Sequence, residues 1–375
     1  MKILNIKNEC TACGVCLSVC PQKCISMPFD EEGFYYPGID SEKCIKCGKC
    51  EKNCHVLNFR ETSGDRSSYY GYSRDAEILK QSTSGGAFYS LAKAILENGG
   101  NVYGAAFDYD DRILKHTSTD AVPITALMKS KYIESYMGNI AEAIQKDVDS
   151  GRQVLFCGTP CQAAAVKKAI RDENSLLTTV DFFCHGVPSS RLFKEHLSKI
   201  TKGRKLLSID FRPKELGWSG KNLKVVTEGK TTVAPHTLDP FYKGFMTTNT
   251  ILRRSCYDCK YRFHHASDIT IGDFWGYRKL EKIPDCRNGL SLIIANNEHG
   301  KKQVEAIRDF ELHKTENKYS DYAYAPKDYS KGLALREKFY SEYAKVGFEK
   351  AAWRVYMKGY YKDLAKHIVK KIIKR

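Results

Sequence analysis

Two runs of cysteine near the N-terminus constrain this 375-residue chain more than any other feature. Each run separates three cysteines by two residues and adds a fourth after three: Cys10, Cys13, Cys16 and Cys20, then Cys44, Cys47, Cys50 and Cys54. Such spacing lets one loop supply three thiolates to a [4Fe-4S] cube while the fourth comes from the other run. The pattern therefore predicts crossed ligation, with Cys54 completing the first trio and Cys20 completing the second.

This doubled spacing is typical of bacterial ferredoxins and predicts a two-[4Fe-4S] module over residues 1–60. A disulfide framework is disfavoured because nothing else in the chain is typical of secretion. Paired zinc sites need only two Cys-x-x-Cys pairs, not two trios with a trailing fourth cysteine. Pro21 follows Cys20 as the motif requires, whereas His55 stands where the second run usually has proline. We expect His55 to affect loop stiffness and not ligation, and Cys24 to be a small buried residue.

Composition indicates where in the cell the chain works and which kind of partner it binds. The N-terminus lacks the apolar region of a signal peptide, and no apolar run approaches the ~18 residues that cross a bilayer, so we expect a cytoplasmic protein. Fifteen cysteines there indicate metal ligation. The formal charge of +16 falls to roughly +10 if three clusters each add about −2. This excess predicts an acidic partner such as ferredoxin; no recognition helix or zinc finger points to nucleic acid.

The remaining chain predicts an α+β protein with a mixed sheet in its body. A polar stretch over residues 60–68 is the expected linker, and the body is expected in two parts, 69–150 and 151–325. Strand, glycine turn, helix and strand follow one another over residues 152–183, which is the pattern of a βαβ unit. Further strands are expected over 102–107, 209–212, 223–227, 269–274 and 290–295.

A helical tail is expected over residues 331–375, and its last helix is amphipathic. An apolar stripe stands against a basic one: Leu364, Ile368, Val369, Ile372 and Ile373 against Lys366, Lys370, Lys371, Lys374 and Arg375. The favoured interpretation is a helix that packs its apolar stripe on the body. The other is a peripheral contact with an anionic membrane or a partner protein.

Six cysteines lie outside the ferredoxin module: Cys157, Cys161, Cys184, Cys256, Cys259 and Cys286. Cys256-x-x-Cys259 is spaced as a chelating pair, Cys161 begins a helix after a glycine-containing loop, and Cys184 ends a strand. Four such thiolates would enclose a third cube. Spacing alone leaves structural cysteines, or a redox dithiol at Cys157-x-x-x-Cys161, equally open.

Five stretches together resemble a known family. They are Thr83-Ser84-Gly85-Gly86, Lys129-Ser130-Lys131-Tyr132, Gly158-Thr159-Pro160-Cys161-Gln162, Cys184-His185-Gly186-Val187-Pro188, and Cys256-x-x-Cys259 with the run from Ser267 to Gly276. The set is similar to the beta subunit family of coenzyme F420 hydrogenase/dehydrogenase, in the bacterial form with an N-terminal ferredoxin pair. The resemblance covers residues 1 to roughly 310 and implies an α/β flavin-binding body.

The resemblance implies FAD and a third [4Fe-4S] cluster in that body. Its thiolate ligands would be Cys161, Cys184, Cys256 and Cys259, with Cys157 and Cys286 as bystanders. Residues implied to approach the flavin are Ser84, Gly85, Gly86, Gly158, Thr159, Pro160 and Gln162, since glycines and helix starts suit a pyrophosphate. Lys129, Lys131 and Tyr132 would hold phosphate or substrate, or the lysines are simply solvated. Asp273 would orient a cofactor or cap a turn.

His185 is the candidate catalytic residue, as a proton donor, or else a group that orients the Cys184 loop. The resulting prediction is an iron-sulfur flavoprotein oxidoreductase that passes electrons from ferredoxin to FAD and then to a two-electron acceptor, in polysaccharide metabolism among other settings. Two alternatives remain open. One is hydride exchange with coenzyme F420, and the other is an electron-transfer adaptor without its own substrate.

Overall fold

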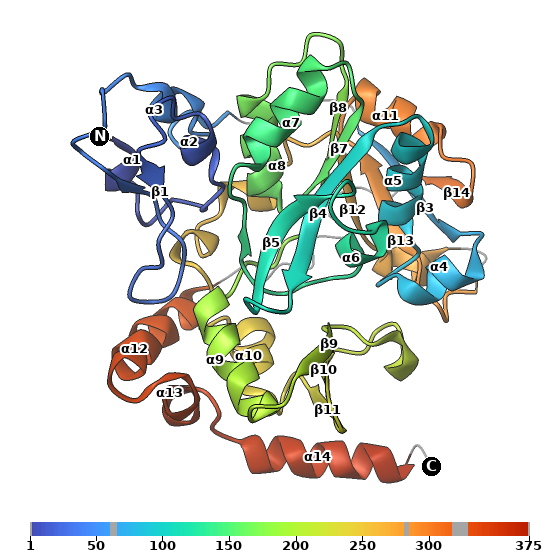
Figure 1. The fold of residues 1–375 in the computed structure, drawn as a ribbon. Coiled ribbons are helices and arrows are strands. Elements are labelled where there is room, and N and C mark those ends of the chain that lie inside the picture. The colour runs from blue at the N-terminus through green and yellow to red at the C-terminus, as the bar shows by residue number, and fades with distance from the viewer. Residues whose placement is uncertain (1, 61–65, 281–284, 317–328, 374–375) are drawn as a thin grey trace.

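The computed structural model describes residues 2–60, 66–280, 285–316 and 329–373. Its N-terminal module is built of short elements around the two cysteine runs. The helices are α1 (Lys2–Asn5), α2 (Val15–Ser18) and α3 (Lys49–Asn53), and β1 (Ile25–Ser26) pairs antiparallel with β2 (Gly38–Ile39). Figure 1 shows this module beside the body, in blue. So little regular structure is consistent with a fold whose interior is largely cysteine.

A nine-stranded mixed sheet forms the body, in the order β14-β3-β13-β12-β8-β7-β4-β5-β6. The strands are β3 (Ser67–Ser73), β4 (Asn101–Asp108), β5 (Ile113–Ser118), β6 (Ser135–Tyr136), β7 (Val154–Cys157), β8 (Leu177–Phe182), β12 (Ile269–Asp273), β13 (Ser291–Ala295) and β14 (Phe310–Thr315). The four strands β12, β8, β7 and β4 run parallel, while β3, β13 and β14 pair antiparallel on one side. This arrangement confirms the predicted mixed sheet.

Helices cover both faces of the sheet because its central strands are apolar on both sides. On β4, Val102 and Ala106 pack toward α5 (Ala87–Glu97), whereas Tyr103 packs toward α7 (Ile140–Asp149). The helices α8 (Pro160–Ala169) and α11 (Glu298–Glu305) complete the two layers, α8 with α7 and α11 with α5. Two short helices, α4 (Ala76–Gln81) and α6 (Ile124–Leu127), lie in the connections. Helices on both faces are typical of strands buried on both sides.

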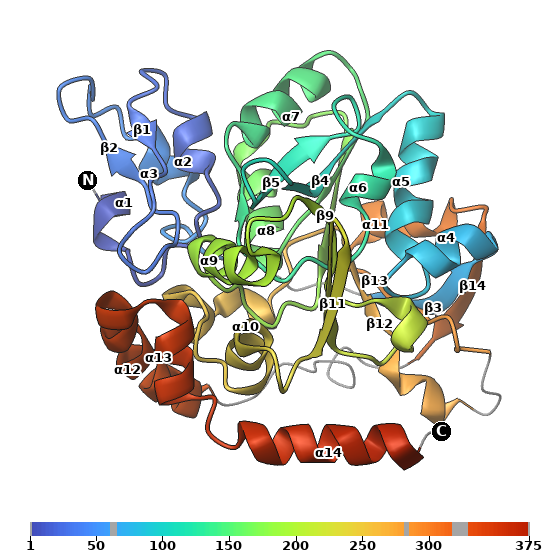
Figure 2. The same ribbon diagram turned by 60° about the horizontal axis from the view of Figure 1, so that its bottom comes forward.

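A second layer of structure packs below the body in Figure 1 and comes to the front in Figure 2. It contains an antiparallel sheet of β9 (Leu206–Asp210), β10 (Asn222–Thr227) and β11 (Lys230–Pro235), with α9 (Ser190–Thr201) and α10 (Pro240–Tyr242). The C-terminal helices α12 (Ser330–Val346) and α13 (Phe348–Val355) close an aromatic core that includes Phe193, Phe241 and Phe339. The predicted helical tail is therefore confirmed, and most of it belongs to this core.

The last helix, α14 (Tyr360–Ile373), differs from the favoured expectation. Leu364 is half-buried, but Ile368 and Val369 are about half exposed, at 49% and 53%. The side chains of residues 370–375 lie outside the described part of the chain. None of the helices in the described residues is long and apolar enough to cross a membrane.

Several polar contacts fix the ferredoxin module on the body. Arg253, which is 1% exposed, donates hydrogen bonds to the carbonyl oxygens of Cys10 (2.7 Å) and Tyr35 (2.9 Å). Ser189 Oγ donates to the Gly33 carbonyl at 2.7 Å, and Arg336 of α12 forms an ion pair with Glu32. Gly33 has φ of +83° and sits so close to Ser189 and Arg191 that a Cβ would meet both. The module is therefore seated on the body at fixed positions.

Candidate functional site

Three groups of cysteine thiols define the candidate site, and the first combines both N-terminal runs. Cys10 and Cys13 lie on the loop that enters α2 and Cys16 lies within that helix, which Gly14 begins in a left-handed conformation. Cys54 ends α3. Burial raises the pKa of Cys16 to about 12, and the neighbouring thiols of Cys10 and Cys54 add to this rise. The first trio and Cys54 are thus together, as crossed ligation requires.

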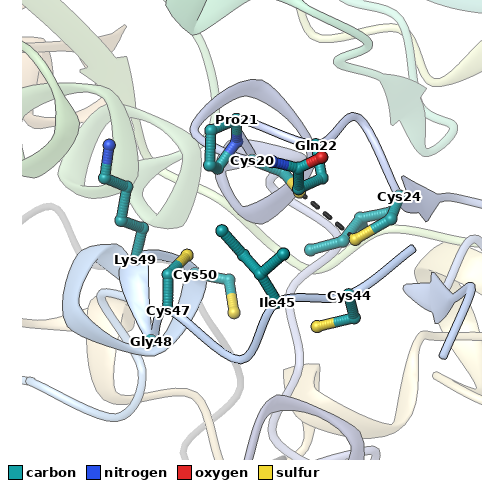
Figure 3. A pocket seen from close by; sticks show the side chains of 11 residues that line it. Cys20, Pro21, Gln22, Cys24, Cys44, Ile45, Cys47, Gly48, Lys49 and Cys50 are labelled. Atoms are coloured by element: carbon teal, nitrogen blue, oxygen red, sulfur yellow. Dashed lines mark hydrogen bonds between the residues drawn. The ribbon is translucent and has the colours of Figure 1, made fainter. Parts of the chain in front are cut away.

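The second group lines a hollow of about 320 Å³ in the same module. Its lining includes Cys20, Cys44, Cys47 and Cys50, and their side chains surround one space in Figure 3. Cys24 also lines this space, and its Sγ lies 3.4 Å from Cys20 Sγ. Cys24 is buried, as predicted, but its contact with a proposed ligand was not foreseen. The spacing of the runs gives no signal for this extra thiol.

The third group joins cysteines from distant parts of the body. Cys161 lies in the first turn of α8, Cys184 follows β8, and Cys256 and Cys259 belong to two short turns of helix between residues 254 and 262. All four line one hollow of about 590 Å³. Burial raises the pKa of Cys161 and of Cys256 to about 12. The charge of the nearby Cys259 thiolate is the second largest cause of the rise at both thiols. Cys157, although close in sequence, is not among the lining residues.

Each group supplies four cysteine thiols, which is the donor set that holds a [4Fe-4S] cube. In the second and third groups the four thiols line one hollow. In the described ranges, no three His, Cys, Asp or Glu side chains are placed to hold one metal ion.

A buried pair of side chains joins the first and third groups. Tyr261, two residues after Cys259, places its hydroxyl 2.6 Å from Nδ1 of His55, which follows Cys54. His55 Nε2 lies 2.9 Å from Thr11 Oγ1, next to Cys10. Burial lowers the pKa of His55 to about 3, so the ring is neutral. A link between the two cysteine groups through His55 was not predicted. The only sequence feature that could have indicated it is that His55 stands after Cys54 where the motif usually has proline.

A buried ion pair lies at the same junction. Arg253 Nη1 is 2.5 Å from Glu134 Oε1, and its guanidinium stacks over Tyr36 at 4.1 Å. Burial raises the pKa of Glu134 to about 7, although Arg253 opposes the rise. Both residues line the third hollow, while Arg253 also bonds the Cys10 carbonyl. Neither Glu134 nor Arg253 belongs to a recognisable sequence motif, and neither was predicted from the sequence to lie at the site.

His185 lines the third hollow, next to Cys184. Its Nε2 is 2.7 Å from Asn249 Oδ1, and its carbonyl accepts a hydrogen bond from Tyr329 at 2.9 Å. Its ring also packs edge-on against Phe245, with centroids 5.2 Å apart. These contacts hold the loop that carries Cys184, and both roles considered for His185 stay predictions.

The residues expected near a flavin fall into two places. Thr159, Pro160 and Gln162 line the third hollow, where Thr159 and Gln162 form a capping box at the start of α8, and Gly158 precedes them. Ser84, Lys129, Tyr132 and Asp273 lie near Arg212 or Lys214. Lys129 pairs with Asp210 at 2.6 Å, and Asp273 pairs with Arg212 at 2.7 Å.

Close packing accounts for part of the Thr83-Ser84-Gly85-Gly86 motif. A Cβ on Gly85 would meet the Gly71 carbonyl at 2.3 Å and the Ser291 nitrogen at 2.5 Å, so only glycine fits there. Gly86, with φ of +92°, begins α5. Ser84 Oγ donates to the Leu290 carbonyl at 2.7 Å, and its own carbonyl accepts from Lys214 Nζ at 2.9 Å. The motif therefore anchors α5 to the sheet beside a lysine.

Tyr132 connects the two places. It packs against Phe245, with ring centroids 5.3 Å apart, and Phe245 in turn contacts His185. Lys131 is half-buried and donates to the Met128 carbonyl at 2.5 Å; burial lowers its pKa to about 7. Burial likewise lowers the pKa of Lys214 to about 8. Partly desolvated lysines of this kind suit an anionic ligand.

Comparisons with known proteins bear directly on these sites. Residues 151–320 match the family model for the C terminus of the beta subunit of coenzyme F420 hydrogenase/dehydrogenase. This part of the chain, residues 151–320, belongs to this family. Residues 9–58 match the 4Fe-4S dicluster domain, so the N-terminal iron-sulfur module is also shown. The prediction from the five motifs is confirmed, and the chain is an iron-sulfur protein of an oxidoreductase family.

Three curated relatives match the chain over short stretches of 60 or 61 residues. The VorC subunit of ketoisovalerate oxidoreductase from Methanothermobacter marburgensis is 35% identical over 60 residues, which cover 16% of the chain and 76% of VorC. An iron-sulfur subunit of the CoB–CoM heterodisulfide reductase from Methanocaldococcus jannaschii is 38% identical over 61 residues, covering 13% of the chain and 9% of that protein. A subunit of NADH-quinone oxidoreductase from Geobacter metallireducens is 38% identical over 61 residues; the match covers 15% of the chain and 47% of that protein.

Among solved structures, a chain of the F420-reducing [NiFe] hydrogenase complex from Methanosarcina barkeri is similar, with 20% identity and a TM-score of 0.46. The match covers 77% of this chain and 91% of that one.

Proposed function

We propose that the chain is an electron-transferring subunit of a flavin-dependent oxidoreductase, with ferredoxin as its one-electron donor. The observation that carries the proposal is the set of three four-cysteine groups, two of them joined through His55 and Tyr261. The first group would be held by Cys10, Cys13, Cys16 and Cys54, the second by Cys20, Cys44, Cys47 and Cys50, and the third by Cys161, Cys184, Cys256 and Cys259. Such clusters supply one-electron carriers.

FAD is the proposed cofactor of the body, because it converts single electrons into hydride chemistry. The residues that would hold it are Lys129, Lys131, Tyr132 and Lys214, with the Gly158–Gln162 loop on the side of the third hollow. Lysine side chains and a helix start suit a pyrophosphate. Within this proposal the His185 ring, whose Nε2 lies 2.7 Å from Asn249 Oδ1, would take part in proton transfer.

A second candidate is an adaptor without its own substrate. It is favoured by the ion pairs that already occupy Lys129 and Asp273, two of the residues implied to approach the flavin. Coenzyme F420, sugars and lipid-linked intermediates are further candidate acceptors for the flavin-dependent reaction.

The test is reduction of the anaerobically purified protein by reduced ferredoxin, followed by the absorbance of bound flavin. The proposal predicts bleaching of one flavin per chain in the wild type and in Cys286→Ala, whose half-buried thiol lies outside the three groups. Cys184→Ala should lose the bleaching. Protein that purifies with iron but binds no FAD, even when FAD is added, would contradict the flavin assignment and favour the adaptor.

A further inference from the structure

The helix α14 presents different residues to the body and to solvent. Tyr360, Asp363, Leu364 and His367 are half-buried, and their spacing places them on one side. Asp363 forms an ion pair of 2.9 Å with the buried Lys243. Figures 1 and 2 both show the helix along one edge of the molecule, with its N-terminal end next to α13. The body therefore holds α14 by the side that carries the Asp363–Lys243 ion pair and the half-buried Leu364.

The opposite side of α14 is apolar and faces water. It carries Tyr361, Ala365, Ile368 and Val369, which recur at i, i+4, i+7 and i+8. Tyr361 is 79% exposed, the highest value among the exposed large hydrophobic residues in the described ranges. Trp353 of α13 is also exposed, and its ring lies 5.0 Å from that of Tyr360. We name Trp353, Tyr361, Ala365, Ile368 and Val369 the outer stripe.

Basic side chains border the outer stripe. Lys358, Lys362 and Lys366 are all exposed, whereas the one acidic residue of the helix, Asp363, is paired with Lys243. A helix with apolar and aromatic residues on one side and lysines beside them is typical of one that lies in a membrane interface. Tryptophan and tyrosine favour the level of the lipid headgroups.

We propose that the outer stripe docks the protein onto the surface of an anionic lipid bilayer. Charge selects this occupant over a second copy of the chain, because a symmetric contact would bring the same lysines of both copies together. Anionic headgroups neutralise those lysines while the acyl boundary receives the apolar side chains. This proposal is independent of the clusters and the flavin.

The experiment is flotation of the full-length holoprotein with vesicles in a density gradient. We expect binding to vesicles of equal parts phosphatidylcholine and phosphatidylglycerol, weaker binding at high salt, and little binding to phosphatidylcholine alone. Ile368→Ser with Val369→Ser should lower the bound fraction about tenfold. The matched control is Leu207→Ser, which changes an exposed apolar residue on β9 and should bind as the wild type does.

A second pair of variants covers the case that the serine variants lose the helix. Lys362→Glu with Lys366→Glu should also lower binding, whereas Lys302→Glu with Lys314→Glu, on α11 and β14, should not. Iron content and circular dichroism check that each variant is intact. Failure of the wild type to float with anionic vesicles at low salt would overturn the proposal. So would equal flotation of the stripe variants, or a dimer seen by sedimentation that only the stripe variants lose.

Discussion

At the scale of single residues, the third group of cysteines gives the sharpest distinction between ligand and bystander. Cys157 and Cys161 are four positions apart, yet only Cys161 lines the third hollow. We predict that Cys256→Ala lowers the iron content of the protein by about four atoms per chain, because three thiolates do not hold the cube firmly.

The control for that measurement is Cys157→Ala, which removes a half-buried thiol at the end of β7 and should leave the iron content unchanged. Iron and sulfide analysis after anaerobic purification gives the answer. Equal iron in both variants would show that Cys256 is not a ligand.

Arg253 and Glu134 supply a second residue-scale prediction. Replacing Arg253 by Met leaves the Glu134 carboxylate buried without its partner, which we expect to cost about 3 kcal/mol of unfolding free energy. The double change Arg253→Met and Glu134→Gln should cost less, because no charge is then stranded. Denaturant unfolding of the four proteins in a double-mutant cycle measures the coupling. A coupling near zero would contradict this account of the pair.

At the scale of elements, a buried histidine ties three helices together. His196 of α9 lies 2.8 Å from Asp239, at the N-terminal end of α10, and 2.9 Å from Glu349 of α13. These carboxylates raise the pKa of His196 to about 9, against the opposing effect of burial. Because the folded-state pKa is raised, its stabilisation is complete below about pH 6.5 and is lost as the pH rises through about 9.

We therefore expect the wild type to lose about 3 kcal/mol of unfolding free energy between pH 6.5 and 9.5 through this group. His196→Gln should remove that part of the pH dependence. The control His313→Gln changes a largely exposed histidine that also lies near a carboxylate. Unfolding curves measured across this pH range test the assignment of the pH dependence to His196. A His196→Gln variant with the pH profile of the wild type would contradict it.

The elements also show how far the sequence alone could lead. The βαβ pattern over residues 152–183 predicted β7, α8 and β8 because apolar strands and a proline-started helix are local signals. The last two strands on one side of the sheet, β14 at the edge and β3 next to it, were not predicted, since Ser67–Ser73 is rich in serine and tyrosine and gains its strand form by pairing. The grouping of Cys161 with Cys256 depends on folding across the body, so only the resemblance to a family indicated it.

At the scale of the whole molecule, two features bear on electron transfer: the fixed position of the ferredoxin module on the body, and the positive net charge of the chain. The ferredoxin module is seated on the body through Arg253, Arg336 and Ser189, contacts that no local pattern announces. The chain as a whole carries a formal charge of +16. We predict that its reduction by an acidic ferredoxin slows as ionic strength rises, because salt screens the attraction that steers the two proteins together.

The control for steering is reduction by an uncharged photoreductant, whose rate should change little with salt. Stopped-flow absorbance at several ionic strengths measures both rates. A ferredoxin rate that is flat across the series would contradict electrostatic steering, whatever the cluster content.

The central claim is that twelve cysteines in three groups hold three cubes in one chain. Quantitative iron and acid-labile sulfide analysis of anaerobically purified wild-type protein tests it most directly. The account predicts about twelve iron and about twelve sulfide per chain. About eight of each, unchanged by Cys184→Ala, would contradict it, because the four cysteines of the body would then hold no cluster.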